Sequence, residues 1–124
     1  MQKKSFKITC SLQEGYGPKG KLFTFADAER VIAGWLDKRL SKKQPYVSGL
    51  LQSGTLIFPA PDKSPEKVSV SPTVIFAGEL SSEQDMQRDD KEVKATLRSL
   101  AMVLRKKLKQ ESVFVIYLDK HWCV

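Results

Sequence analysis

The feature that most constrains the fold is a pair of amphipathic segments, each lying between segments of strand character. Residues 24–44 and about 89–109 both carry apolar side chains at helical spacing, so each predicts a helix with one buried face. Acidic residues lie near the start of each segment and basic residues near its end, which complements the helix dipole. Pro45 prevents the first helix from continuing. Two such helices need a shared apolar surface, which a sheet built from the flanking strands would supply.

The first helix also has a start signal. Thr24 has the side chain of a helix N-cap, and Asp27 stands three positions later, where a capping box places its acceptor. The apolar stripes identify the side of each helix that should face the core. These residues are Phe25, Ala28, Ile32, Trp35, Leu36 and Leu40 in the first helix, and Val93, Leu97, Leu100, Ala101, Leu104 and Leu108 in the second.

Three segments before the second helix have strand character. Residues 5–12 alternate apolar and polar side chains, as a half-buried strand does. Residues 46–59 predict either one long bulged strand or a hairpin that turns at residues 53–54. Residues 67–80 predict a strand in which Pro72 lacks an N–H donor and therefore marks an edge segment or a bulge.

The last strand, residues 112–118, completes the order β-α-β-β-α-β. This order predicts an α+β fold of the ferredoxin-like type, in which both helices cover one face of the sheet. If residues 46–59 turn back on themselves, the sheet gains an extra β-hairpin. The 124 residues can bury one core, so we expect a single domain over residues 1–124.

The last strand is apolar on both faces, which bears on the partners of the protein. Phe114, Ile116 and Leu118 are apolar, and so are the residues that alternate with them. Because both helices should cover a single face, we expect another copy of the chain to cover the second face. The alternative is a central strand that the linker at 59–66 shields. The expected interface residues are Phe114, Ile116, Tyr117 and Leu118.

The two cysteines, Cys10 and Cys123, do not predict a disulfide. The first and last strands of the predicted fold are antiparallel, which places these residues near opposite ends of the sheet. A disulfide needs Cα atoms within about 7 Å, so we expect free thiols. Two cysteines and one histidine are too few for a structural zinc site, and we expect no metal and no cofactor.

The chain is basic, with 21 Lys and Arg against 14 Asp and Glu and a net charge of +7. Such a surface attracts nucleic acids, acidic proteins and anionic membranes alike, so charge alone selects no partner. Most basic residues lie at the ends of two helices that should run antiparallel, which separates them and weakens the case for nucleic acid. No apolar run approaches the ~20 residues of a membrane span, and no signal peptide is recognisable. We therefore expect a cytoplasmic protein that does not bind membranes.

The most suggestive motif is the glycine-rich loop at 15–21, Gly-Tyr-Gly-Pro-Lys-Gly-Lys. It matches G-x-G-x-x-G, the motif of dinucleotide-binding folds. In those folds the last glycine lies where the helix packs on the strand, whereas here residues 21–23 separate it from the helix. It also nearly matches the phosphate loop, although Leu22 replaces the hydroxyl residue that binds magnesium. A milder interpretation is an anion held by backbone N–H groups and lysines, and the alternative is a loop with solvated lysines. The candidate anion-binding residues are Tyr16, Gly17, Lys19, Gly20 and Lys21.

Candidate catalytic residues are few. His121 is the only histidine, and nothing in the spacing gives it the partner that a general base needs. Glu79 and Glu111 could form an acid–base pair, but solvated strand ends account for both residues better. The sequence therefore identifies no catalytic residue.

The motifs identify no protein family, and a ferredoxin-like scaffold alone implies no function. The sequence best fits a small non-enzymatic binding module, homo-oligomeric, with a protein or a small molecule as its partner. The first alternative is a nucleic-acid-binding protein that uses its basic surface. The second is a small cofactor-free enzyme with a site at a subunit interface, where His121 or Tyr16 would act.

Overall fold

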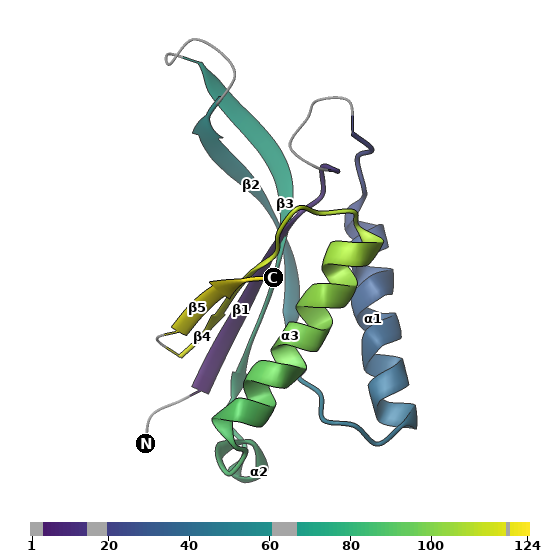
Figure 1. The fold of residues 1–124 in the computed structure, drawn as a ribbon, viewed down its shortest axis with the longest axis vertical. Helices are drawn as coiled ribbons and strands as arrows, with labels where there is room; N and C mark the ends of the chain where they lie inside the picture. Colours follow the sequence, from purple (N-terminus) through teal and green to yellow (C-terminus); the bar gives the residue numbers. More distant parts are fainter. Residues whose placement is uncertain (1–3, 15–19, 61–66, 119) are drawn as a thin grey trace.

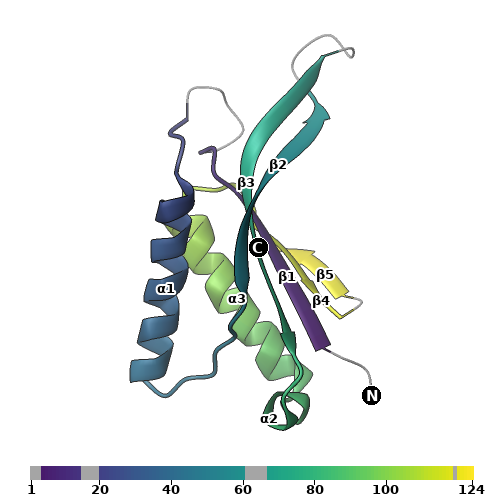
Figure 2. The same ribbon diagram turned by 180° about the vertical axis from the view of Figure 1, so that it is seen from behind.

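The computed structural model describes residues 4–14, 20–60, 67–118 and 120–124 as an α+β fold (Figure 1). Its strands form one antiparallel sheet in the order β2-β3-β1-β4-β5, and α1 and α3 lie together on one face of it (Figures 1 and 2). The first four strands have the ferredoxin-like order, so the predicted fold class is confirmed. The elements are β1 (Lys4–Ser11), α1 (Phe25–Ser41), β2 (Leu50–Pro59), β3 (Val68–Leu80), α2 (Glu83–Met86), α3 (Asp90–Lys107), β4 (Phe114–Tyr117) and β5 (Lys120–Cys123).

Both predicted helices are present, and their boundaries follow from local chemistry. The capping box of α1 is complete, since the Thr24 hydroxyl accepts from the Asp27 N–H at 3.1 Å and an Asp27 carboxylate oxygen accepts from the Thr24 N–H at 2.8 Å. Asp89 is the N-cap of α3, and its carboxylate accepts from the Lys91 N–H. The short helix α2 lies between β3 and α3, and the Ser82 side chain caps it. None of the helices described is long and apolar enough to cross a membrane.

Within the segment at 46–59, residues 50–59 form one strand, β2, and not a hairpin. Its register with β3 is unbroken from Leu50↔Ala77 to Pro59↔Val68, so there is neither a turn nor a bulge at residues 53–54. The next strand, β3, is long enough to pair with every residue of β2, so the backbone groups of β2 have more partners than a short hairpin within this segment would give them. The far half of this β2–β3 ribbon extends beyond the helices (Figures 1 and 2).

Pro72 occupies an edge segment of β3, as predicted. The neighbouring strand β1 ends where Ser11 pairs with Thr73, so Pro72 lies just beyond it. The Pro72 carbonyl accepts from the Leu12 N–H at 2.9 Å on that side. The Leu12 carbonyl, which the missing N–H would face, accepts from the Phe23 N–H at 2.8 Å instead, so Pro72 leaves no acceptor of this pair without a donor.

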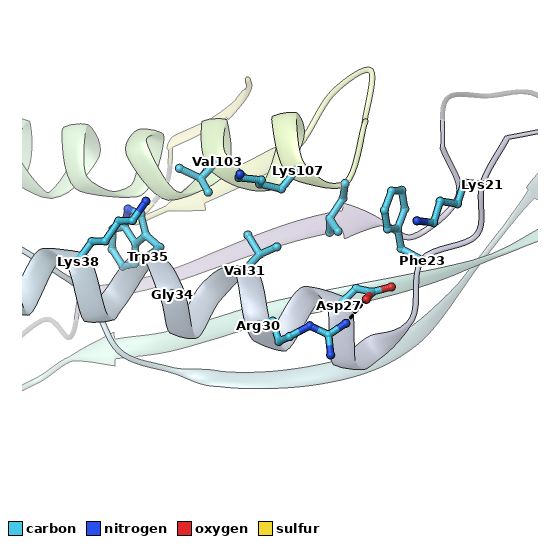
Figure 3. A pocket seen from close by; sticks show the side chains of 11 residues that line it. Lys21, Phe23, Asp27, Arg30, Val31, Gly34, Trp35, Lys38, Val103 and Lys107 are labelled. Atoms are coloured by element: carbon cyan, nitrogen blue, oxygen red, sulfur yellow. Dashed lines mark hydrogen bonds and ion pairs between the residues drawn. The ribbon is translucent and has the colours of Figure 1, made fainter.

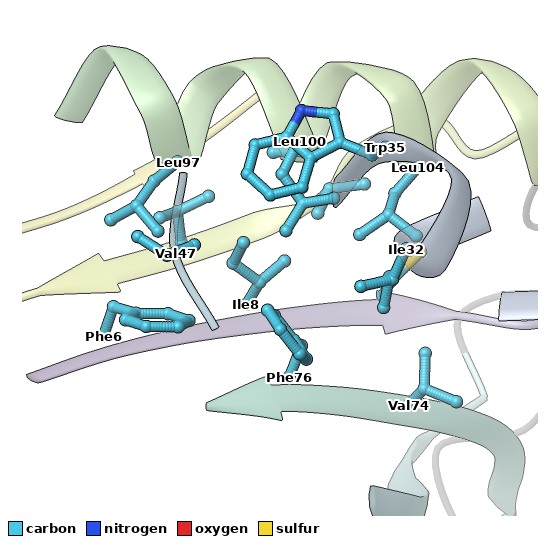
Figure 4. Close-up of a cluster of buried hydrophobic side chains, with 14 of the residues drawn as sticks. Phe6, Ile8, Ile32, Trp35, Val47, Val74, Phe76, Leu97, Leu100 and Leu104 are labelled. Atoms are coloured by element: carbon cyan, nitrogen blue, oxygen red, sulfur yellow. The ribbon is translucent and has the colours of Figure 1, made fainter. Parts of the chain in front are cut away.

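The core lies between the sheet and the two long helices (Figure 4). Phe6 and Phe76 approach with ring centroids 5.8 Å apart, and the Trp35 indole N–H donates to the Ser99 hydroxyl at 3.1 Å. Most of the predicted helix stripes are buried. Two members are not: Phe25 is 37 % exposed and Leu40 53 % exposed, since they lie in the first and last turns of α1. The largest fully buried side chains are Tyr117, Ile8, Leu97, Leu100, Leu104 and Leu108.

The chain reverses after β4, which corrects the predicted placement of the cysteines. Leu118 has φ 57°, and β5 then runs back along β4, with Cys123 paired with Phe114. Phe114 in turn pairs with Thr9, so Cys123 lies at the same end of the sheet as Cys10, on the opposite face. Both thiols are free, as predicted. The physical reason is different: two strand spacings, roughly 10 Å, separate the residues.

Candidate functional site

The described part of the predicted anion loop is held by contacts with Gln13 and Glu14. Tyr16, Gly17 and Lys19 lie outside the described residues. The Gly20 carbonyl accepts from the Gln13 side-chain amide at 2.7 Å, and a Cβ added at Gly20 would lie 2.1 Å from the Glu14 carbonyl oxygen. Only glycine allows this approach. The next residue, Lys21, turns its side chain towards α1 and lines a pocket there.

This pocket, the helix pocket, has a volume of about 390 Å³ and lies between α1, α3 and the segment before α1 (Figure 3). Its floor is apolar and its rim is basic. The Lys21 ammonium lies 5.0 Å from the centroid of the Phe23 ring. The lining residues are Lys21, Phe23, Asp27, Arg30, Val31, Gly34, Trp35, Lys38, Val103, Lys107 and Leu108.

Among the residues that the structure describes, Asp27 is the one acidic residue that lines the helix pocket. Its hydrogen bond from the Thr24 backbone, and the Arg30 guanidinium with which it forms an ion pair, keep the pKa of this carboxyl below its usual value. The Asp27 carboxylate is therefore already hydrogen-bonded to the first turn of α1 and ion-paired with Arg30. Within the described parts of the chain, Lys21, Lys38 and Lys107 form no salt bridge.

A second pocket, the loop pocket, has a volume of about 590 Å³. It lies where the C-terminal end of α1 and the loop at 43–48 meet the end of β3, α2 and the first turn of α3. Its charged residues are balanced, with the carboxylates of Glu79, Asp85 and Glu92 and the cations of Arg39, Lys43 and Arg88. Its other lining residues are Leu40, Gln44, Pro45, Tyr46, Val47, Ser48, Leu80, Ser82 and Gln84.

Arg88 organises the loop pocket. Its guanidinium donates to both Glu92 carboxylate oxygens, at 2.8 and 2.7 Å, and to the Tyr46 carbonyl at 2.8 Å. Asp85 completes the cluster at 3.4 Å. Hydrogen bonding by Arg88, followed by that of Thr96, lowers the pKa of Glu92, so this carboxylate is ionised at neutral pH. A bidentate pair of this kind fixes both side chains and joins α2, α3 and the loop at 43–48.

The two glutamates considered as an acid–base pair do not meet. Glu79 pairs with Ser5 near the beginning of β1 and lines the loop pocket. Glu111 precedes β4, whose first residue pairs with Thr9 towards the other end of β1. The sheet therefore places the glutamates at opposite ends. The backbone of His121 lies on β5, paired with Ile116.

The predicted interface residues divide between the two faces of the sheet. Phe114 and Ile116 are 53 % and 40 % exposed, and they lie on the face that the helices leave open. Tyr117 is fully buried on the helix side, so its assignment to an interface is wrong. Leu118 follows the strand, is half-buried against the core, and donates its N–H to the Ser5 carbonyl at 3.1 Å.

Tyr117 has a structural partner that the sequence does not reveal. Its hydroxyl donates to a carboxylate oxygen of Asp90 at 2.7 Å, and the Lys4 ammonium lies 3.2 Å from the same oxygen. The residues come from β4, the first turn of α3 and β1. No local motif links such distant positions, so only the fold could identify this cluster.

Comparisons with known proteins give the fold a counterpart. No protein family model matches the sequence, and no curated protein does. Two solved structures match nearly the whole chain. One is a phage SAM lyase in complex with S-methyl-5′-thioadenosine, with a TM-score of 0.68 and 14% identity over 98% of this chain and 88% of that one. The other is a phage SAM lyase in the apo state, with a TM-score of 0.68 and 15% identity over 98% and 87%.

This match overturns the expected function. A non-enzymatic binding module was the prediction, with a nucleic-acid-binding protein as its first alternative, whereas the phage SAM lyase that matches this fold along nearly its whole length is an enzyme. The prediction failed because the ferredoxin-like pattern describes a scaffold and carries no information about chemistry. At 14% identity, the likeness shows that this chain has the same fold as a phage SAM lyase.

Proposed function

We propose that this protein is an enzyme that cleaves a sulfonium substrate of the SAM type. The observation that carries the proposal is the shared fold over 98% of the chain with a phage SAM lyase. S-methyl-5′-thioadenosine is what remains of SAM when the bond between the sulfur and the amino acid side chain breaks. The bonding electron pair passes to sulfur, which loses its charge. The amino acid fragment either closes onto its own carboxylate oxygen or releases a proton from the adjacent carbon, so no co-reactant is consumed.

The loop pocket suits this substrate better than the helix pocket does. SAM carries a sulfonium, an ammonium and a carboxylate, so its site needs both negative and positive groups. The loop pocket has both carboxylates and cations, whereas the helix pocket has four cations against the carboxylate of Asp27. Within the loop pocket, Asp85 would face the positive groups and Lys43 the substrate carboxylate. Tyr46, 44 % exposed, offers an aromatic surface for the adenine ring.

The charge change during cleavage assigns roles to the two kinds of lining residue. A carboxylate beside the sulfonium stabilises the substrate more than the transition state, because the positive charge on sulfur is being lost. Apolar residues such as Leu40, Val47 and Leu80 favour the less charged transition state. We therefore assign substrate binding to Asp85 and the acceleration of cleavage to the apolar part of the pocket.

Turnover of SAM and binding of S-methyl-5′-thioadenosine test the proposal. Purified protein incubated with SAM should release S-methyl-5′-thioadenosine. Chromatography of the reaction mixture detects and quantifies this product. Replacement of Asp85 by Asn should raise KM by roughly tenfold and change kcat less, since a charge contact made in the ground state is lost. Glu29→Gln is the matched control, because Glu29 is exposed on α1 and lines neither pocket. Absence of both turnover and binding would contradict the proposal.

We also propose that the chain self-associates through the sheet face opposite the helices. Phe114 and Ile116 are exposed there, and Leu50 and Leu56 on β2 are 63 % and 50 % exposed on the same face. Apolar side chains gathered on one open face favour burial against a second copy of that face.

A further inference from the structure

We propose that the helix pocket binds a small organic anion with an apolar body and a phosphate group, of the size and type of a nucleoside monophosphate. The pocket is separate from the loop pocket, and the two share no lining residue. The proposal is therefore independent of the lyase activity proposed above.

The charge of the helix pocket points to an anion. Lys21 precedes α1, Lys38 lies in its last turns, and Lys107 ends α3, so three separate segments direct ammonium groups to one hollow. Figure 3 shows these side chains around the cavity, with Lys38 and Lys21 at its two ends. Arg30 already has Asp27 as its partner. Among the described residues, no carboxylate forms a salt bridge with these lysines, so an anion in the pocket would offset their positive charge.

The floor of the helix pocket points to a ligand that also has an apolar part. Val31, Val103 and Leu108 line it, together with the edges of two aromatic residues that are almost fully buried, Phe23 at 8 % and Trp35 at 6 % exposure. A site for inorganic phosphate alone would not need this surface. Pockets that hold small molecules combine a mainly apolar lining with a few polar groups, and they have volumes of about 300–1,000 Å³. The helix pocket, at about 390 Å³, lies within this range.

Gly34 keeps the helix pocket open. It lies within α1, where glycine costs about 1 kcal/mol of helix stability relative to alanine. A Cβ added at Gly34 would meet no atom within 4 Å, so close packing does not demand glycine here. The missing side chain leaves room along the α1 wall of the cavity (Figure 3). A larger side chain at this position would occupy the space that we assign to the ligand.

The test uses AMP as the probe and adenosine as its uncharged counterpart. Trp35 reports binding through its fluorescence, and the Trp122→Phe background removes the signal of the other tryptophan. AMP should change the Trp35 signal saturably, and adenosine should bind at least roughly tenfold more weakly, because the charge-assisted hydrogen bonds to phosphate are missing. Equal binding of AMP and adenosine, or no AMP binding, would overturn the proposal.

Matched variants locate the probe. Lys107→Glu should weaken AMP binding by roughly tenfold or more, whereas Lys106→Glu, in the same helix turn but outside the pocket, should leave it within about twofold. Gly34→Leu should abolish binding and leave the unfolding transition cooperative, since the added side chain fills open space. Binding that survives Gly34→Leu, or equal effects of the two lysine variants, would overturn the proposal. Loss of SAM turnover in Gly34→Leu would also overturn it, because the helix pocket would then be the lyase site.

Discussion

Individual side chains in this protein are best explained by what lies across the fold from them. The carboxylate of Asp90 accepts from the buried Tyr117 hydroxyl, whose hydrogen bond is the main cause of the lowered pKa of Asp90, with Lys4 as the next. The pKa of Tyr117 is raised, first by burial and then by the hydrogen bond to Asp90. The Tyr117–Asp90 hydrogen bond thus makes the stability of the fold depend on pH in both the acidic and the alkaline range.

The sign of this coupling can be derived for each group. A lowered carboxyl pKa stabilises the folded state above the unfolded value of about 3.9, and this contribution is lost as the pH falls through the lower folded value. A raised tyrosine pKa contributes fully below about pH 10 and is lost as the pH rises towards the folded value. We therefore expect the free energy of unfolding to fall above pH 10 through Tyr117.

Urea unfolding between pH 8 and 11 checks this expectation. Tyr117→Phe should be less stable than the wild-type protein at pH 8, and its stability should decline less steeply above pH 10, because the titrating hydroxyl is gone. Tyr46→Phe is the control, since Tyr46 is exposed and its replacement should leave the alkaline decline unchanged. Parallel pH profiles for the wild-type protein and Tyr117→Phe would show that Tyr117 does not titrate in this way.

The helices and strands show which parts of the fold local rules can predict. Thr24 and Asp27 form their capping box within one turn, and the alternation in β1 and Pro72 in β3 also act locally, so the sequence predicted all three. The reversal between β4 and β5 was missed. It depends on Leu118 adopting φ 57°, which is unusual for leucine and is stabilised by its N–H bond to Ser5 on β1.

The two glycines closest to the helix pocket should respond in opposite ways to alanine. Gly34→Ala should raise the free energy of unfolding by about 0.5–1 kcal/mol, because alanine is the better helix former and its methyl group meets open space. Gly20→Ala should lower the free energy of unfolding by about 1 kcal/mol or more, because its methyl group would overlap the Glu14 carbonyl. Denaturant unfolding measures both. A destabilising Gly34→Ala would mean that the helix packs more tightly there than the structure shows.

The molecule as a whole has a closed face and an open face. The helices cover one side of the sheet, while β1 turns Lys7 and Ser5 outward in the middle of the other. The open face is therefore less apolar than the last strand suggested, and its apolar residues lie towards the sides, at Phe114, Ile116 and Leu50. The proposed self-association depends on these lateral groups.

Light scattering over a range of protein concentrations tests the proposed self-association. The wild-type mass should be a multiple of 14.0 kDa, and Phe114→Lys should shift it towards 14.0 kDa, because a charge would enter the apolar contact. Met102→Lys is the control, since Met102 is 51 % exposed on α3, on the other side of the molecule. A mass of 14.0 kDa for the wild-type protein at every concentration would contradict the proposal.

The sequence by itself determined the helices, most of the strands and the α+β class, because caps, periodicity and proline act over a few residues. Only the tertiary structure decided where charges and cavities meet. Lys21 and Lys107 are far apart in the sequence and share the helix pocket, while Glu79 and Arg88 line the loop pocket from different elements. Such sites depend on the packing of helices against the sheet, which brings together residues that no local pattern relates.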